Sequence, residues 1–84
     1  MYELRLTRSA RKELERLPDA SLNRVARQLD LLAREPRPRG CKKLRGAHDL
    51  WRIRVSDYRI IYHVDDQEHL IEVRAIRHRK DAYE

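Results

Sequence analysis

The stretch WRIRVSDYRIIYHV, residues 51–64, decides the fold because two classes of side chain alternate along it. Trp51, Ile53 and Val55 alternate with arginines, and a second apolar series resumes after Ser56 and Asp57, at Tyr58, Ile60, Tyr62 and Val64. A period of two residues is typical of half-buried strands. We therefore expect two antiparallel strands joined by a tight turn at Ser56-Asp57. One face is apolar, and the other carries Arg52, Arg54, Arg59, Ile61 and His63.

Two further strands are expected on either side of this hairpin. After it, DDQE (residues 65–68) predicts a turn and HLIEVRAI (residues 69–76) a last strand. At the other end of the chain, YELRL (residues 2–6) places Tyr2, Leu4 and Leu6 on one face and predicts a first strand.

Between these strands the apolar residues change to a helical period. TRSARKELERL (residues 7–17) predicts a helix with Thr7 or Ser9 as N-cap, and Pro18-Asp19 stops it and caps a second helix. EPRPRG (residues 35–40) ends that second helix because two prolines cannot continue it. Its apolar stripe consists of Leu22, Val25, Leu29 and Leu32. The order β-α-α-β-β-β over residues 1–84 predicts one α+β domain, with two N-terminal helices on one face of a small, twisted and mainly antiparallel sheet.

The charge balance points to an anionic partner. There are 20 Lys+Arg against 14 Asp+Glu, a net charge of +6 and a pI near 10.0. Only Lys12, Lys42, Lys43 and Lys80 are lysines, so 16 of the 20 cations are arginines. Arginine binds phosphate in a bidentate manner, so this excess favours a phosphate-bearing partner, although a genomic bias towards arginine codons would also produce it.

Several classes of protein do not fit the composition. A single cysteine, Cys41, excludes an internal disulfide and any cysteine-rich zinc site. The histidines at 48, 63, 69 and 78 lack ligand-like spacing, so we expect no metal cofactor. No apolar run approaches the roughly 20 residues that a membrane span needs, and no signal-peptide core is present. We expect a cytoplasmic protein that does not bind membranes.

The C-terminal stretch RHRKDAY, residues 77–83, contains groups suited to cleaving an RNA backbone. The cations Arg77, Arg79 and Lys80 can stabilise the extra charge on a pentacoordinate phosphate, and His78 or Tyr83 can transfer a proton. Such a route needs no metal ion. The competing interpretation is that these residues, and the arginines of the hairpin, are ordinary solvent-facing charges.

The segments LRG, WRIRV, DYRIIY and HRKDAY, in this order and spacing, resemble those of the RelE-type toxins of the RelE/ParE superfamily. The resemblance covers nearly the whole chain and implies the toxin of a bacterial type II toxin–antitoxin system. Members of the RelE branch are ribosome-dependent endoribonucleases that cut mRNA in the ribosomal A site. A RelB-like antitoxin would wrap and block the toxin, and the complex would bind operator DNA through the antitoxin.

The resemblance also implies roles for individual residues. The family's catalytic positions fall on Arg52, Arg59, Arg79 and Tyr83, where Arg59 would hold the scissile phosphate and Arg79 would stabilise or protonate the leaving group. Arg45 and Arg54 match positions that contact RNA, and Arg77 and Lys80 are expected to assist them.

One departure from the family affects the expected mechanism. Positions 52 and 54 are lysine in some members and arginine here, and arginine practically cannot act as a base. The base role would then pass to Tyr83 or His78.

The sequence is also compatible with two other functions. A ParE-like toxin shares the fold and inhibits DNA gyrase without cutting RNA, and an inactive member would only bind its antitoxin. The net charge of +6 favours an acidic antitoxin that folds on binding.

Overall fold

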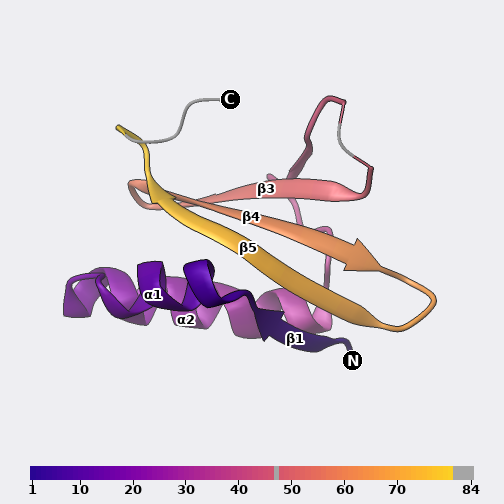
Figure 1. The fold of residues 1–84 in the computed structure, drawn as a ribbon, viewed down its shortest axis with the longest axis horizontal. Helices are drawn as coiled ribbons and strands as arrows, with labels where there is room; N and C mark the ends of the chain where they lie inside the picture. Colours follow the sequence, from indigo (N-terminus) through magenta and orange to yellow (C-terminus); the bar gives the residue numbers. More distant parts are fainter. Residues whose placement is uncertain (47, 81–84) are drawn as a thin grey trace.

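The computed structural model describes residues 1–46 and 48–80. Its elements are β1 (Glu3–Leu6), α1 (Arg8–Glu15), α2 (Asp19–Arg34), β2 (Lys42–Lys43), β3 (Leu50–Val55), β4 (Tyr58–Asp65) and β5 (Leu70–His78). The strands form a 5-stranded sheet in the order β1-β5-β4-β3-β2, in which only β1 and β5 pair in parallel. Both helices lie on the same side of β3, β4 and β5 (Figure 1). This is the α+β arrangement that the sequence predicts.

Two strand predictions need correction. No strand was expected at residues 42–43, because two successive lysines show no alternation, yet Lys42 and Lys43 pair with Arg52 and Trp51 at the sheet edge. The last strand was expected to end at Ile76, but it continues to His78. It does so because β4 begins at Tyr58, which is the cross-strand partner of His78.

The helix ends follow from local hydrogen bonding. The hydroxyl of Thr7 accepts the N–H of Ala10 at 3.2 Å, so of the two predicted caps Thr7 is the one that caps α1. Asp19 is not the cap of α2 but its first residue: Pro18 is the cap, and the Pro18 carbonyl accepts the N–H of Leu22 at 2.8 Å. Proline offers no side-chain acceptor, so the Asp19 carboxylate in the first turn supplies the favourable interaction with the helix dipole.

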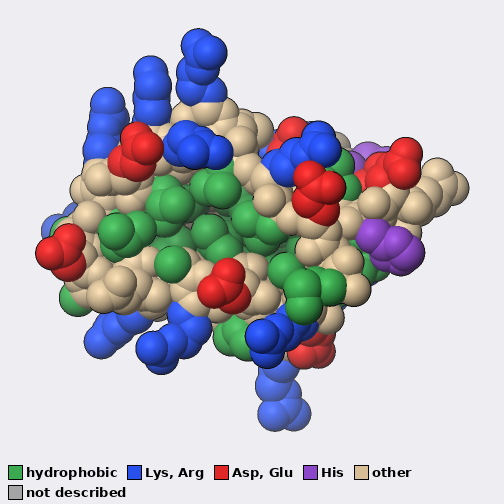
Figure 2. Space-filling model, turned by 90° about the horizontal axis from the view of Figure 1, so that it is seen from below, with side chains coloured by type: hydrophobic (Ala, Val, Ile, Leu, Met, Phe, Trp, Pro, Cys, Tyr) green, Lys and Arg blue, Asp and Glu red, His purple; other side chains and the backbone are tan. Residues whose placement is uncertain are grey.

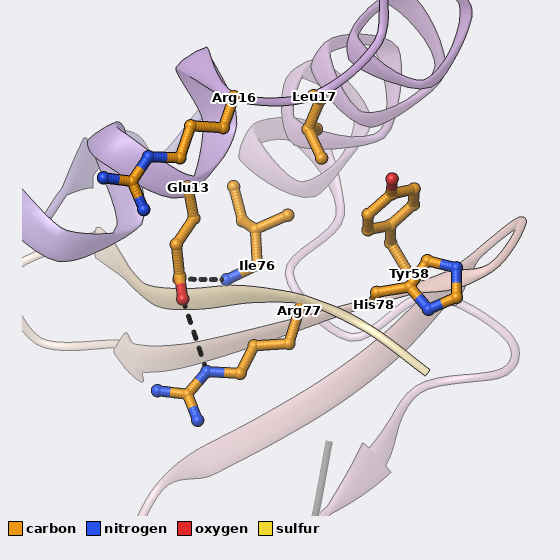
Figure 3. A pocket seen from close by; sticks show the side chains of 7 residues that line it. All are labelled: Glu13, Arg16, Leu17, Tyr58, Ile76, Arg77 and His78. Carbon is orange, nitrogen blue, oxygen red and sulfur yellow. Dashed lines mark hydrogen bonds and ion pairs between the residues drawn. The ribbon is translucent and has the colours of Figure 1, made fainter. Parts of the chain in front are cut away.

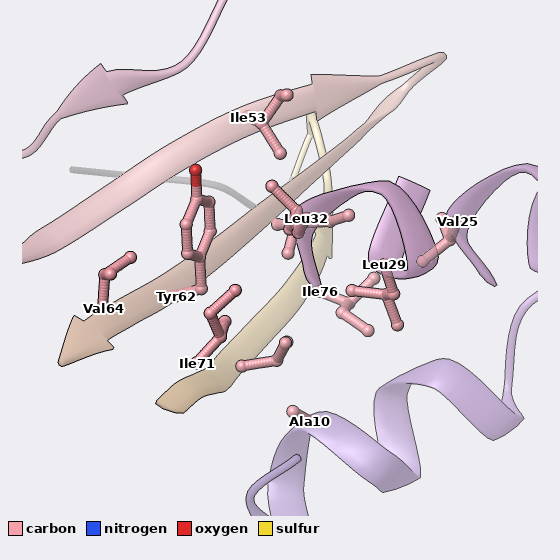
Figure 4. Packing of buried hydrophobic residues seen from close by; sticks show 11 residues of the cluster. Ala10, Val25, Leu29, Leu32, Ile53, Tyr62, Val64, Ile71 and Ile76 are labelled. Atoms are coloured by element: carbon pink, nitrogen blue, oxygen red, sulfur yellow. The ribbon is translucent and has the colours of Figure 1, made fainter. Parts of the chain in front are cut away.

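The core lies between the sheet and the helices (Figure 4). Val25, Leu29 and Leu32 of α2 are buried, in agreement with the predicted stripe. The inner face of the sheet contributes Ile53, Ile60, Tyr62, Val64, Ile71, Val73 and Ile76. Tyr62 is fully buried, and its hydroxyl donates to the Pro36 carbonyl at 2.7 Å, which ties the proline-rich loop to the sheet. Burial raises the pKa of the Tyr62 phenol well above its usual value.

Helix α1 protects the edge of β5 that β1 leaves uncovered. β1 pairs with β5 only from Leu70 to Val73. Beyond that point a carboxylate oxygen of Glu13 accepts the backbone N–H of Ile76 at 2.9 Å. An unpaired strand edge invites pairing with another chain. The side chain of Glu13 therefore takes the place of a neighbouring strand at this position.

An ion-pair network joins three segments at the other end of the molecule. The Arg37 guanidinium donates two hydrogen bonds to the Asp66 carboxylate, at 3.2 and 2.8 Å, and the Tyr2 hydroxyl donates a third at 2.6 Å. Arg37 also lies over the Trp51 ring, 5.1 Å from its centroid. Because hydrogen bonds from Arg37 and Tyr2 stabilise the charged form, the pKa of Asp66 falls from 3.8 to about 2.

No helix within residues 1–46 and 48–80 is long and apolar enough to cross a membrane.

Asp66 should give the protein an acid-sensitive component of stability. Its pKa is about 2 in the folded chain against 3.8 for the free group, so its contribution is present above pH 3.8 and is lost as pH falls towards 2. Asp66→Asn should remove this component, giving lower stability at neutral pH and a flatter dependence between those values. Urea unfolding at a series of pH values measures both effects.

Arg37→Ala is the matched variant for this prediction, because it removes the main cause of the shift and leaves the carboxylate in place. It should flatten the same part of the pH dependence. An unchanged dependence in both variants would show that the network contributes nothing to stability.

Candidate active site

The strand register gathers arginines on the outer face of the sheet. Arg54 of β3 lies opposite Arg59 of β4, and Arg59 lies opposite Arg77 of β5. Directly opposed residues in an antiparallel pair are separated by about 4.5–5.5 Å between Cα atoms. Like charges at this spacing oppose folding, so the arrangement is better suited to holding an anion than to stabilising the sheet.

A β-bulge in β5 puts Arg77 on this outer face. Ile61 pairs with Ala75 but Tyr62 pairs with Val73, so Arg74 is an extra residue without a partner in β4. The extra residue reverses the alternation, and Val73 and Ile76 both face the core although three positions separate them. Without the bulge, Arg77 would point towards the core.

A pocket of about 280 Å³ lies where these strands end. It is lined by Arg54, Ser56, Asp57, Tyr58, Arg59 and Arg79, and we call it the arginine pocket. Ser56 and Asp57 form the two-residue turn between β3 and β4, and Val55 pairs directly with Tyr58 across it. Ser56 has a φ of 56°, a conformation that costs a non-glycine residue roughly 1–2 kcal/mol. The guanidinium of Arg24, in α2, donates a hydrogen bond to the Ser56 hydroxyl at 3.3 Å.

Arg79 reaches the pocket because the turn holds its backbone. The N–H of Arg79 donates to the Asp57 carbonyl at 2.7 Å. Its guanidinium Nε lies 3.9 Å from the Asp57 carboxylate, and the two side chains are 69% and 58% exposed. An ion pair this long and this exposed is weak. The backbone of Arg79 is therefore fixed while its guanidinium stays available to a ligand.

Comparison with known proteins agrees with this fold. Residues 4–83 match a family model described as the ParE toxin of type II toxin–antitoxin systems, parDE. Toxin RelG of Mycobacterium tuberculosis is 31% identical, and the alignment covers 98% of this chain and 95% of RelG. The chain belongs to this toxin family, in its RelE-type branch.

Solved structures support the same assignment. The chain is similar to the archaeal RelE–RelB complex from Pyrococcus horikoshii, with 34% identity, a TM-score of 0.84 and coverage of 96% of this chain and 98% of that one. It is also similar to the intact RelBE toxin–antitoxin complex of Escherichia coli, with 27% identity, a TM-score of 0.81 and coverage of 90% and 94%.

The toxin's structure brings three of the candidate residues together and separates others. Arg54, Arg59 and Arg79 share the arginine pocket. Arg52 lines an adjoining groove, in which Arg54 also takes part. Arg45 lies in an exposed hollow with Leu44 and His48, at the far end of β3. Lys80 is exposed just beyond β5, and Tyr83 lies outside the described residues.

Arg77 and His78 line a different cleft, on the α1 side of the sheet (Figure 3). It has a volume of about 450 Å³ and also includes Glu13 and Tyr58. The Nε of Arg77 lies 3.4 Å from the Glu13 carboxylate, which draws this guanidinium around the sheet edge. The His78 ring meets the Tyr58 ring edge-on, with centroids 5.2 Å apart. His78 is therefore not a lining residue of the arginine pocket.

Sequence reasoning missed Asp57 and Tyr58 as parts of the pocket. Asp57 was expected only to form the turn, yet its carbonyl anchors Arg79. Antiparallel pairing of β4 and β5 does place the end of β5 beside the start of β4, where Asp57 and Tyr58 lie. Predicting this contact requires the full length of β5, which the local sequence pattern does not give.

Glu13 should contribute to stability through two contacts. Glu13→Ala leaves the Ile76 N–H without its acceptor and Arg77 without its partner, so we expect a loss of about 1–2 kcal/mol. Glu13→Gln should cost less, because its amide oxygen can still accept from Ile76. The urea midpoint measures both.

Glu15→Ala is the matched control, since Glu15 is exposed on the same helix. If Glu13→Ala unfolds at the same midpoint as this control, the edge contact is unimportant.

Proposed function

We propose that this toxin is a ribosome-dependent endoribonuclease that cuts mRNA in the ribosomal A site and so inhibits translation. The observation that carries the proposal is the convergence of Arg54, Arg59 and Arg79 in one pocket at the end of the β3–β4 hairpin. Three guanidinium groups around a small open pocket suit a phosphate group. Similarity to RelE-type toxins supports the same reading.

In the proposed reaction the 2′-oxygen of the RNA attacks the adjacent phosphorus. The new 2′-O–P bond forms as the P–O5′ bond breaks, and the leaving oxygen takes a proton from solvent water, which leaves a 2′,3′-cyclic phosphate and a 5′-hydroxyl end. Arg59, which lines the pocket, holds the non-bridging oxygens, and Arg79 stabilises the charge that develops on the leaving oxygen. Arginines thus supply the positive charge that a metal ion supplies elsewhere, and we propose a metal-independent reaction.

The proton must leave the 2′-hydroxyl for a base. Tyr83 and His78 are the two candidates, and Tyr83 lies outside the described residues. Nδ1 of His78 already accepts the backbone N–H of Lys80 at 3.2 Å, which favours Tyr83. No imidazole lines the arginine pocket, so we propose that the ribosome supplies the geometry that brings the 2′-hydroxyl and the base together.

The proposed partners are mRNA on the ribosome and a RelB-like antitoxin, all in the cytoplasm. Hydrophobic side chains gather in the middle of the face that the helices present, where an antitoxin segment could cover them (Figure 2). The net charge of +6 favours an acidic antitoxin. The complex would bind operator DNA through the antitoxin.

A defined mRNA in a reconstituted translation reaction tests this function. Primer extension should map breaks within A-site codons for the wild type, and only when ribosomes are present. Arg59→Ala and Arg79→Ala should each lower the cleavage rate by about a hundredfold or more, because each removes a donor to the transition state.

Arg8→Ala/Arg11→Ala is the matched control for the double variant Arg59→Ala/Arg79→Ala. It removes the same charge from the exposed surface of α1 and should cut normally. Undiminished cleavage by the double variant would refute the proposed site.

Gyrase inhibition is the second candidate, favoured by the description of the matching family as ParE toxins. Intact mRNA, together with inhibition of supercoiling by the purified toxin, would support it over RNA cleavage.

A further inference from the structure

A second cationic cavity adjoins the arginine pocket. This groove has a volume of about 380 Å³ and lies between α2 and the outer edge of β3. Its lining residues are Gln28, Arg39, Gly40, Lys42, Arg52, Ile53 and Arg54. Four of these seven side chains carry positive charge and none carries negative charge. We call it the β3 groove.

The fold leaves this groove open because β2 is so short. Lys42 and Lys43 pair only with Arg52 and Trp51, so within residues 1–46 and 48–80 β3 has no neighbouring strand from Ile53 onwards on that side. The loop before β2 turns sharply, with the Cys41 N–H donating to the Pro38 carbonyl at 3.1 Å. Gly40 in this turn has a φ of 96°, which other residues rarely adopt.

Three of the four cations in the groove have no ion-pair partner among the described residues. Arg39, Lys42 and Arg54 form no ion pair within the part of the chain that the structure describes. Lys42 lies directly opposite Arg52, which places two positive charges against each other. In a chain of net charge +6, such a cluster concentrates positive potential in a concave site and attracts a polyanion.

We propose that the β3 groove binds phosphates of the same RNA strand, next to the nucleotide that is cut. This inference rests on the proposed function and extends it, because Arg54 lines both the groove and the arginine pocket. Arg52 and Arg54 alternate along β3 on one face, about 7 Å apart. That spacing is comparable to the distance between successive phosphates of an extended single strand. The RNA would follow β3 from Arg39 and Lys42 into the pocket.

The groove binds the backbone rather than particular bases. Its charged groups are guanidinium and ammonium donors, which recognise phosphate regardless of sequence. An acidic peptide pairing with the open edge of β3 is the competing occupant. RNA is favoured because Arg52 and Arg54 share the outer face with Arg59, so one polyanion can contact all three.

The salt dependence of RNA binding tests this proposal without requiring cleavage. The probe is a short, fluorescein-labelled 2′-O-methyl oligoribonucleotide, which has no 2′-hydroxyl to attack. Fluorescence anisotropy with the full-length chain gives the affinity over a series of KCl concentrations. Each phosphate contact to a single strand adds about 0.7 to the slope of log K against log salt. Arg39→Ala/Lys42→Ala should therefore lower this slope by about 1.4.

Arg8→Ala/Lys12→Ala is the matched control, since it removes the same two charges from exposed positions on α1. A slope for Arg39→Ala/Lys42→Ala equal to that of the control would overturn the proposal. Loss of binding to poly-L-glutamate, with RNA binding retained, would assign the groove to an acidic peptide instead. The salt dependence of binding can be measured even if the toxin does not cleave mRNA. The proposed function and the proposed role of the β3 groove can therefore be refuted separately.

His78 accepts a hydrogen bond within the turn that follows β5. Its Nδ1 accepts the N–H of Lys80 at 3.2 Å, so the proton of the neutral imidazole lies on Nε2. Arg79 sits between these two residues and is anchored on its own N–H by the Asp57 carbonyl. We infer that His78 is a positioning residue, which closes the turn after β5 and so fixes the backbone of Arg79.

Two variants with amide side chains, His78→Asn and His78→Gln, distinguish a positioning role from the role of a base. In His78→Asn, the amide oxygen occupies the place of Nδ1 and can accept from Lys80, whereas His78→Gln reaches the place of Nε2. Neither side chain titrates. His78→Asn should keep cleavage and its pH profile close to wild type, while His78→Gln and His78→Ala lose about fivefold through one hydrogen bond.

Amide hydrogen exchange gives a readout that needs no activity. The Lys80 amide should exchange faster in His78→Gln and His78→Ala than in the wild type or His78→Asn. If His78→Asn folds but loses as much activity as His78→Ala at every pH, His78 carries a proton and the inference is wrong.

Discussion

Val55 pairs with Tyr58 across a turn of only two residues, and this turn fixes the register of the β3–β4 hairpin. Because side chains alternate along a strand, a slip of one residue would move every apolar side chain of β3 to the outer face and every arginine inwards. Ile53 and Ile60 could not then share the core. The register that buries them also places Arg54 opposite Arg59. Core and arginine pocket are thus two consequences of one pairing.

The two open edges of the sheet are treated differently. The uncovered part of β5 is closed by α1, where Glu13 accepts the N–H of Ile76. The outer part of β3 is covered by only the two residues of β2. A closed edge discourages pairing with other chains, and an open edge lined with arginine and lysine resists it through charge. The same positive charges leave β3 accessible to a polyanion.

Most of the fold follows from the sequence because each element carries a clear period. The alternation in residues 51–64 predicts the hairpin and its arginine face, and the stripe at Val25, Leu29 and Leu32 predicts the buried side of α2. The strand β2 could not be predicted, since two lysines at an edge bury nothing. The anchoring of Arg79 by Asp57 was also inaccessible, because it depends on how far β5 extends along β4.

The bulge at Arg74 shows that core packing determines where the C-terminal arginines lie. Ile71, Val73 and Ile76 are all buried, but strict alternation cannot place residues 73 and 76 on one face. An extra residue resolves the conflict, and the burial of Ile76 stabilises it. Once the alternation is reversed, Arg77 lies opposite Arg59, and the chain leaves the strand beside the Ser56-Asp57 turn. Hydrophobic burial at Ile76 therefore directs Arg79 to the pocket, although Ile76 does not line that pocket.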